Sequence, residues 1–250
     1  MTNTLSPDTS NAGGIFKMAI DQSFSMLRIT ARVCLLAGSL MAAAQGTAQA
    51  ESYVAGQFGL TVPSMSGGLT NVDLTGSFPE GSTFSDNALK SSLLFGAKFG
   101  HFFNRAPWFG LETEAFMTNP HIKQQPLTLT VPPVSATAEL PGAYFRVVTW
   151  APVNLVFRYP GKRLQPYVAI GPGLFFARIK DPNSSDSQSD TRLGLNTQVG
   201  IRYFVTRHFA LFGEWKFNHA RFRFDEKPDY FGFNGTYNMH HFVLGLGYHF

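Results

Sequence analysis

The C-terminal residues 240–250 alternate between large apolar side chains and small or polar ones, and this pattern restricts the fold more than any other. Side chains of a strand point alternately to its two faces, so the stretch predicts a strand with one bulky apolar face and one nearly empty face. A glycine-rich face suits a narrow interior, and a chain ending on an apolar aromatic residue suits a terminus against lipid. We therefore expect the closing strand of a transmembrane β-barrel. The apolar face carries Phe242, Leu244, Leu246, Tyr248 and Phe250, and the other carries His241, Val243, Gly245, Gly247 and His249.

Seven earlier stretches show the same alternation, so the expected fold is all-β, with eight antiparallel strands. Their connections alternate between long polar segments and short turns. This alternation is expected when one end of a barrel carries short periplasmic turns and the other carries long extracellular loops. Within one long connection, the run 127–131 predicts a hairpin that extends beyond the membrane. The seven stretches lie at 53–62, 93–100, 109–117, 145–158, 167–176, 194–203 and 211–218.

The composition argues against other classes of protein. Charged residues make up only 14% of the chain, against roughly a quarter in soluble proteins. A helical membrane protein needs apolar runs of about 20 residues, and none occurs after residue 50. The net charge of +4 is scattered, so nucleic-acid binding is not expected. A soluble lipocalin-like barrel would place apolar residues inside and charges outside, the reverse of this pattern.

Residues 26–50 have the three parts of a cleaved signal peptide: a basic start with Arg28 and Arg32, an apolar core, and the small-residue site Ala48-Gln49-Ala50. A transmembrane anchor is the alternative, but the apolar run is too short for it. Residues 1–25 are expected to be a non-native extension or disordered, with Met26 a plausible start. The barrel is expected to occupy residues 51–250. The single cysteine, Cys34, lies in the leader, so no disulfide is expected.

Charges of both signs fall on the inward faces of the predicted strands. A buried charge needs a partner or water, because removing it from water alone costs several kcal/mol. A barrel of about eight strands is just wide enough to be filled by side chains, so we expect a lumen closed by salt bridges. A gate or proton path is the functional alternative for the same residues. The predicted network comprises Lys98, Glu112, Glu114, Arg146, Arg158, Arg202, Glu214 and Lys216. In the stretch 145–158, the phasing that puts Arg146 inside puts Phe145, Val147 and Ala151 outside.

Two segments resemble the mid-barrel signature of the OmpA-like and Opa-like superfamily of small outer-membrane barrels. The first is Gln-Pro-Tyr-Val-Ala-Ile-Gly-Pro-Gly at 165–173, preceded by Asn-Leu-Val-Phe-Arg at 154–158. The second is Gly-Ile-Arg-Tyr-Phe-Val-Thr at 200–206, which leads into Ala-Leu-Phe-Gly-Glu-Trp at 210–215. The resemblance covers residues 51–250 and implies an outer-membrane barrel of a Gram-negative cell, exported through its signal peptide, with both termini periplasmic.

The resemblance also implies an assembly signal formed by Gly245, Tyr248 and Phe250 and read by the barrel assembly machinery. Val243 departs from the signal, which often has a polar residue there. The peptidoglycan tether of OmpA itself is not carried over, since no such domain follows the barrel in this sequence.

Other candidate sites lie near the chain's loop ends. Arg178, Lys180, Arg221 and Arg223 are all phased outward, and we expect them to contact lipopolysaccharide phosphates or to be ordinary solvated strand ends. His240 lies on the opposite face from His241 and His249, so no metal site is expected. Some small outer-membrane barrels are lipid A deacylases with an outward His and Ser. Here His219 is expected to have no nearby hydroxyl as a nucleophile, so neither enzymatic activity nor a cofactor is expected.

Three functional classes remain open. The first is a structural or surface-interaction barrel in outer-membrane lipid, whose loops contact a host or surface ligand. The second is a narrow porin-like conduit for small solutes, and the third is a lipid A-modifying enzyme. The first leads, because the loops are long and polar and no catalytic set accompanies them.

Overall fold

The computed structural model describes residues 51–64, 68–85, 87–140, 142–181, 186–227 and 230–250. The expected extension at 1–25 and the expected signal peptide at 26–50 lie outside these residues. Within the described residues, no helix has the length and apolar character needed to cross a membrane.

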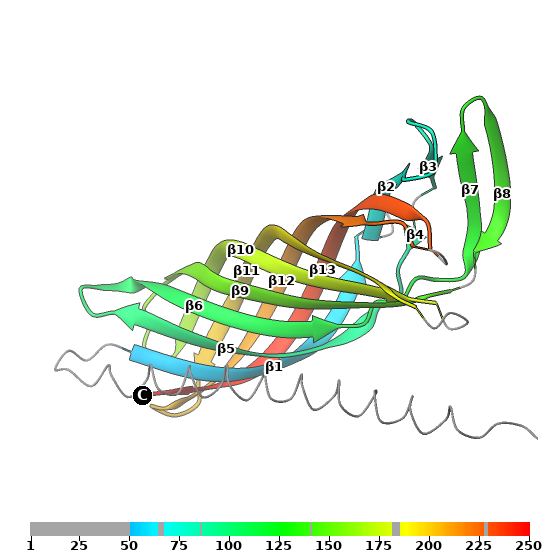
Figure 1. Ribbon diagram of the computed structural model, residues 1–250. Helices are drawn as coiled ribbons and strands as arrows, with labels where there is room; N and C mark the ends of the chain where they lie inside the picture. The colour runs from blue at the N-terminus through cyan, green and yellow to red at the C-terminus, as the bar shows by residue number, and fades with distance from the viewer. Residues whose placement is uncertain (1–50, 65–67, 86, 141, 182–185, 228–229) are drawn as a thin grey trace, which may run out of the picture. The chain divides into compact units, whose positions relative to one another are not determined.

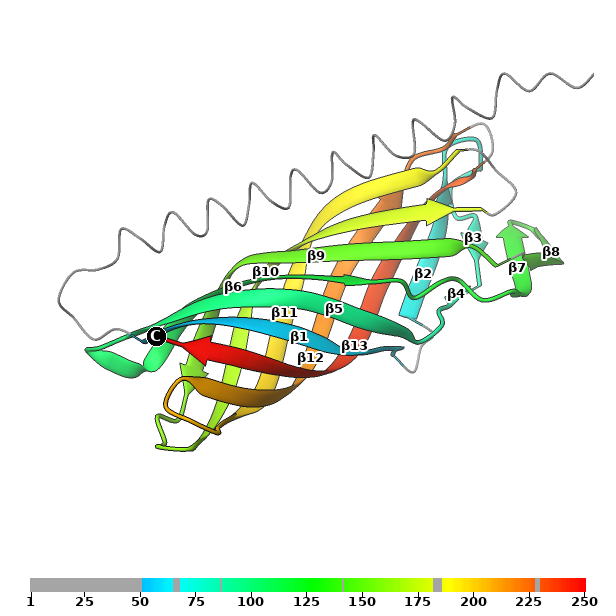
Figure 2. The same ribbon diagram turned by 90° about the horizontal axis from the view of Figure 1, so that it is seen from below.

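Eight long antiparallel strands form a closed barrel, which confirms the predicted fold (Figures 1 and 2). Each strand pairs with the next, and the last strand pairs back onto the first, so the ring has no open edge. The eight strands are β1 (Glu51–Pro63), β5 (Ser92–Phe103), β6 (Ala106–Thr118), β9 (Tyr144–Arg158), β10 (Leu164–Lys180), β11 (Gln188–Phe204), β12 (Phe209–Phe224) and β13 (Gly232–His249).

The two faces of the wall differ as the alternation predicts. In β1, Phe58 is 57% exposed, whereas its neighbour Gln57 is 5% exposed. In β13, Leu244 is 59% exposed, whereas His241 is fully buried. Large apolar side chains therefore cover the outside and polar side chains fill the inside, which is the arrangement of a barrel surrounded by hydrocarbon.

Strand β9 departs from the predicted phasing because it contains a β-bulge. Between Leu155 and Trp150, β9 uses one more residue than its partner β10, and the pairing with β6 shifts at the same place. The extra residue lies next to Pro152, which cannot donate to the ladder. Alternation is therefore shifted by one position in the part of β9 that precedes the bulge. The expectation that Phe145, Val147 and Ala151 face outward is wrong: all three are buried.

The inner and outer faces exchange character toward the end of the barrel that carries the long loops. There the interior holds an apolar cluster rather than charges. On the outside of β10, Leu174 and Phe176 are followed by the exposed residues Arg178 and Lys180. Such a rim, apolar inside and charged outside, is the pattern of a barrel standing in water rather than lipid. The cluster comprises Leu69, Val72, Leu89, Ile122, Phe145, Val147, Phe175, Ala177, Ile179, Ala220, Phe222, Phe224, Tyr237 and Met239.

Three connections are short turns (104–105, 159–163 and 205–208) and four are long, as predicted. The first long connection contains more structure than its sequence indicates: β2 (Gly68–Thr75), β3 (Thr83–Phe84) and β4 (Asn87–Ala88). Here β2 pairs with β13, so it continues the wall past the end of β1. The second contains β7 (Gln125–Val131) and β8 (Val134–Leu140), the hairpin that the run 127–131 predicts.

The two ends of the barrel domain meet at the turn end of the ring. The backbone N–H of Ser52 donates to the carbonyl oxygen of Phe250 at 3.1 Å, and the N–H of Phe250 donates to the carbonyl oxygen of Ser52 at 2.9 Å. The side chain of Phe250 stacks on Tyr248 outside the barrel, with ring centroids 6.2 Å apart. The final residue therefore belongs to the seam between β1 and β13.

The change in the outer face along β10 predicts where lipid ends. Single cysteines at Leu174, Phe176, Arg178 and Lys180, each spin-labelled, should report oxygen contact at the first two positions and contact with a water-soluble nickel complex at the last two. The measurement is collision accessibility by electron paramagnetic resonance in lipid vesicles. Equal lipid contact at 174 and 178 would contradict the assigned boundary.

Deleting Phe250 should sharply lower the amount of assembled barrel, because it removes two backbone hydrogen bonds of the seam and an outward aromatic side chain. Heat-modifiable gel migration of outer-membrane fractions measures the folded amount. Tyr159→Ala is the control, since this exposed tyrosine lies in a turn away from the seam. A normal surface level of the deletion variant would count against the importance of the seam.

Candidate functional site in the barrel lumen

The middle of the lumen contains a compact layer of lysine and glutamate side chains contributed by three strands. Lys98 of β5 lies 2.5 Å from Glu214 Oε1 and 3.3 Å from Glu112 Oε1. Lys216 forms an ion pair with Glu114 and lies 3.2 Å from Glu214 Oε2. Glu112 and Glu114 are two positions apart on β6, and Glu214 and Lys216 are two positions apart on β12. Alternation therefore points both members of each pair into the interior. The five side chains are therefore paired with one another rather than with water.

Neutral side chains donate to both oxygens of Glu112 and Glu114 and to Oε1 of Glu214, whereas Oε2 of Glu214 faces Lys216 alone among the described residues. Asn196 Nδ2 donates to Glu114 Oε1 at 2.7 Å, and Gln198 Nε2 donates to Glu112 Oε1 at 2.7 Å. The hydroxyl of Tyr53 donates to Glu112 and that of Tyr167 donates to Glu214. A buried ion pair is tolerated when its lone pairs are satisfied in this way. Further amide donors to Glu114 come from Gln57 and Asn154.

A second layer closes the turn end of the lumen. The guanidinium of Arg158 binds both carboxylate oxygens of Glu51, at 2.8 and 2.5 Å, and its ring-facing side lies 3.6 Å from the centroid of Phe102. Glu51 also contacts His249 Nδ1 at 2.8 Å. The guanidinium of Arg202 lies 4.2 Å from the ring centroid of Tyr53. A carboxylate and an aromatic face thus hold Arg158, and an aromatic face holds Arg202.

A third layer lies between the lysines and the apolar rim. His241 is fully buried, with Thr61 Oγ1 at 2.9 Å from Nδ1 and Asn218 Oδ1 at 2.8 Å from Nε2. Asn218 in turn donates to Asn196 Oδ1 at 2.7 Å, which links this layer to Glu114. Both ring nitrogens of His241 are therefore engaged in hydrogen bonds, so its position is fixed by β1 and β12.

Seven of the eight residues predicted for the lumen lie there, but they form two groups: the central layer, and Arg158 and Arg202 toward the turn end. The expectation that Arg146 faces the lumen is wrong, because the bulge in β9 places this side chain on the outside. Glu51 was not among the predicted residues. Position 51 is in phase with the inward-facing positions of β1, and this phase is the signal that could have identified it.

The three residues of the expected assembly signal lie on both faces of β13. A Cβ at Gly245 would collide with the ring of Phe212, so glycine is needed there for packing inside the lumen. Tyr248 and Phe250 lie outside.

Among the described residues, no group of histidine, cysteine, aspartate and glutamate could hold a metal ion. His219 Nδ1 contacts Asn238 Oδ1 at 2.7 Å.

The four predicted outer cations lie in two separate places. Arg178 and Lys180 are on β10, beside Arg146 of β9. Arg221 and Arg223 are on β12, where acidic groups accompany them: the backbone N–H of Arg223 donates to Asp190 and its side chain lies 3.8 Å from Asp225. The outward cations are thus not one continuous site.

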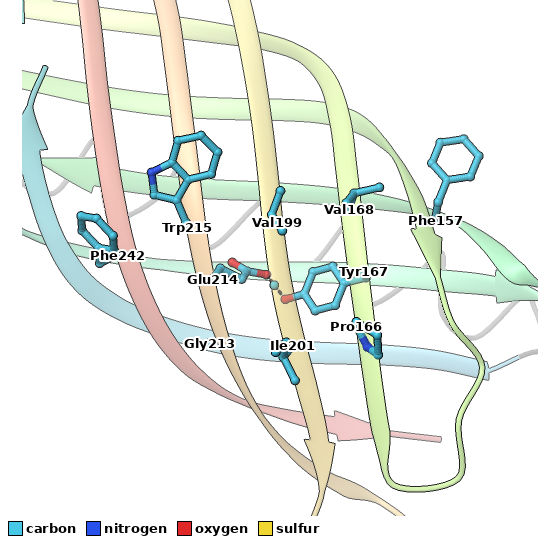
Figure 3. Close-up of a pocket in the computed structure, with 11 residues that line it drawn as sticks. Phe157, Pro166, Tyr167, Val168, Val199, Ile201, Gly213, Glu214, Trp215 and Phe242 are labelled. Atoms are coloured by element: carbon cyan, nitrogen blue, oxygen red, sulfur yellow. Dashed lines mark hydrogen bonds between the residues drawn. The ribbon is translucent and has the colours of Figure 1, made fainter.

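A hollow of about 720 Å³ opens in the outer wall over β10, β11 and β12, and Phe157 of β9 and Phe242 of β13 border it. Figure 3 shows its apolar lining and, behind it, the hydrogen bond between Tyr167 and Glu214. The hollow exists because Gly213 has no side chain to cover the wall at an outward position. Its lining matches hydrocarbon, so it belongs to the lipid-facing surface.

A family model and a solved structure agree with the barrel fold. The model of the outer membrane protein beta-barrel domain family matches residues 30–250. The crystal structure of OprG from Pseudomonas aeruginosa is similar over 82% of this chain and 98% of its own, at 16% identity and a TM-score of 0.53. Neisserial surface protein A is similar over 82% and 100%, at 11% identity and a TM-score of 0.48. No curated protein sequence matches the chain.

Removing one lysine of the central layer should destabilise the barrel strongly. Lys98→Met leaves the buried Glu112 without its paired cation and Glu214 with Lys216 alone among the described cations, which costs about 3–5 kcal/mol of unfolding free energy. Urea unfolding in lipid vesicles, followed by the fluorescence of the outward residues Trp108, Trp150 and Trp215, gives this value. The matched control is Arg146→Met, which should change it by less than about 0.5 kcal/mol because Arg146 is exposed. Equal effects of the two substitutions would show that the central layer contributes no more to the unfolding free energy than an exposed arginine does.

Proposed function

Because the chain belongs to the outer membrane protein beta-barrel domain family, and is therefore an outer-membrane protein, we propose that it is a closed, non-catalytic barrel. Its role is structural and includes contacts made by its surface loops. The single observation that carries the proposal is the occlusion of the lumen. The lysine and glutamate side chains of the central layer are at most 5% exposed, and an apolar cluster covers them toward the loop end.

Polar contacts inside the lumen support a plug rather than a gate. Each carboxylate of the central layer has at least one cation and one neutral donor within hydrogen-bonding distance. Opening a path would separate several such pairs at once in a space with little water, where each separation is costly. The narrow conduit remains the alternative function, because the lining residues of the middle layers are polar.

The second long connection supports the surface-contact part of the proposal. Among the described residues, β3 is the only strand outside the hairpin of β7 and β8 that pairs with it, and β8 is the last strand of the sheet order. Its described side chains from Val134 to Thr137 are exposed. An exposed strand edge of this kind can pair with a strand of another protein. We therefore assign contact with a host or surface ligand to this hairpin.

The export route also belongs to the proposal. The signal peptide at 26–50 is cleaved after Ala50, and the mature protein is inserted into a Gram-negative outer membrane by the barrel assembly machinery. In support, the side chain of Glu51, the residue directly after the expected cleavage site, holds Arg158 and His249. The barrel therefore uses the first residue that cleavage would leave.

Single-channel recording tests the closed lumen. The folded protein in planar lipid bilayers should give no stepwise conductance at moderate voltage, whereas an open porin reconstituted in the same way gives clear steps. Heat-modifiable migration shows that the reconstituted protein is folded. Reproducible conductance steps of the folded wild type would overturn the proposal in favour of the conduit.

A further inference from the structure

A groove of about 460 Å³ lies on the outside of the barrel at the loop ends of β9 and β10, which Figure 2 shows side by side. Three cations line it: Arg146 from β9, and Arg178 and Lys180 from β10. The bulge in β9 creates this arrangement, because without it Arg146 would point into the lumen. The other outward-facing lining residues are Asn119, His121 and Tyr144.

The cations of the groove have no acidic partner among the residues that the structure describes. Arg146 and Arg178 are direct partners in the pairing of β9 with β10, so two guanidinium groups lie opposite each other. Like charges in this relation destabilise a sheet. Within the part of the chain that the structure describes, neither arginine nor Lys180 has a carboxylate within 4.0 Å. An anion bound between them would remove the repulsion.

Neighbouring side chains hold the two guanidinium groups through one nitrogen only. Arg146 Nε donates to Asn119 Oδ1 at 2.9 Å, and Arg178 Nε donates to Ser187 Oγ at 3.2 Å. The Nη groups, which form the donor fork that suits a phosphate, make no hydrogen bond to any described residue. The arginines are thus oriented while their strongest donors stay available.

The surroundings of His121 show that the positive potential extends across the groove. The pKa of His121 lies below its usual value, first because the side chain is partly buried and then because of the charges of Lys90 and Arg146. His121 Nδ1 accepts the backbone N–H of Phe145 at 3.4 Å, so Nε2 of the neutral ring carries the proton and can donate a hydrogen bond. Its ring meets Tyr144 edge to face, with centroids 5.1 Å apart, which holds it at the rim.

The position of the groove along the barrel axis favours an anion that is carried by a lipid. Directly below it, Val148 and Phe176 are partners on the outsides of β9 and β10, and Trp150 and Leu174 form the next pair further from the groove. The groove therefore begins where hydrocarbon ends, at the level of the headgroups on the loop side of the membrane. A phosphate on a lipid of that leaflet is held at this level, so its effective concentration is high.

We propose that Arg146, Arg178 and Lys180 bind a phosphate group of lipopolysaccharide, the phosphorylated glycolipid of the outer leaflet. The proposal rests on the Gram-negative setting of the proposed function but not on its closed lumen. Its test uses purified protein, so conductance in bilayers would leave it standing. It also separates this groove from Arg221 and Arg223, which the sequence alone groups with Arg178 and Lys180.

The test is the binding of deep-rough lipopolysaccharide to protein refolded without it in detergent. The triple substitution Arg146→Ala, Arg178→Ala and Lys180→Ala should weaken binding at least about tenfold, since it removes several charge-assisted hydrogen bonds. The matched control is Arg221→Ala with Arg223→Ala, two cations also exposed on the outside, which should change binding less than about twofold. Heat-modifiable migration checks folding, and Arg178→Gln alone, with an expected loss of about threefold or more, serves if the triple variant does not fold.

Two further probes identify the ligand. Lipopolysaccharide stripped of its phosphates should bind wild type as weakly as intact lipopolysaccharide binds the triple variant. Inorganic phosphate at millimolar concentration should not displace intact lipopolysaccharide, because it lacks the lipid anchor. The proposal is overturned by unchanged binding in the triple variant, by an equal loss in the Arg221 and Arg223 control, by undiminished binding of the stripped glycolipid, or by full displacement with inorganic phosphate.

Discussion

The structure depends on the neutralisation of charge in a lumen that holds little water. Two lysines and Arg202 share the interior with three glutamates, so the buried charges balance. Because each ion is costly to bury alone, strands β5, β6, β11 and β12 must keep the register that brings the partners together. The ion pairs thereby tie residues far apart in sequence, such as Lys98 and Glu214, to one geometry of the ring. The apolar exterior places the barrel in lipid, and the ionic interior fixes which strand stands opposite which.

Much of the barrel could be predicted from side-chain alternation, because lipid outside and a crowded lumen inside impose opposite demands on successive residues. The phasing of β1, β5, β6, β10, β11, β12 and the end of β13 follows from this rule. The rule failed in β9, where an extra residue beside Pro152 shifts the phase and moves Arg146 to the outside. It also failed at the rim, where apolar residues such as Phe145 and Phe175 turn inward because the surroundings change from hydrocarbon to water. Neither a bulge nor a membrane boundary has an unambiguous signature in one sequence.

The predicted site residues differ in how well sequence reasoning can group them. Lys98 and Glu114 are recognisable because a charge at an inward position needs a partner nearby. The uncharged partners, such as Tyr53 and Asn196, could not be assigned to a network without distances. On the outside, phase alone suggested that Arg178 and Arg221 act together. In the structure they lie on different strands, β10 and β12, and acidic groups accompany the cations of β12. Grouping therefore required the register between strands.

The seam between β1 and β13 has a consequence for biogenesis. It joins the first strand of the chain to the last, with Tyr53 opposite His249 and Pro63 opposite Met239. Loop closure over nearly the whole barrel domain must precede these contacts, and the half-formed sheet exposes two unpaired borders until then. Closure must wait until β13, which carries the partner residues of β1, has left the ribosome. Ring closure is therefore a late step, and the unpaired borders must be kept from pairing with other chains until it occurs.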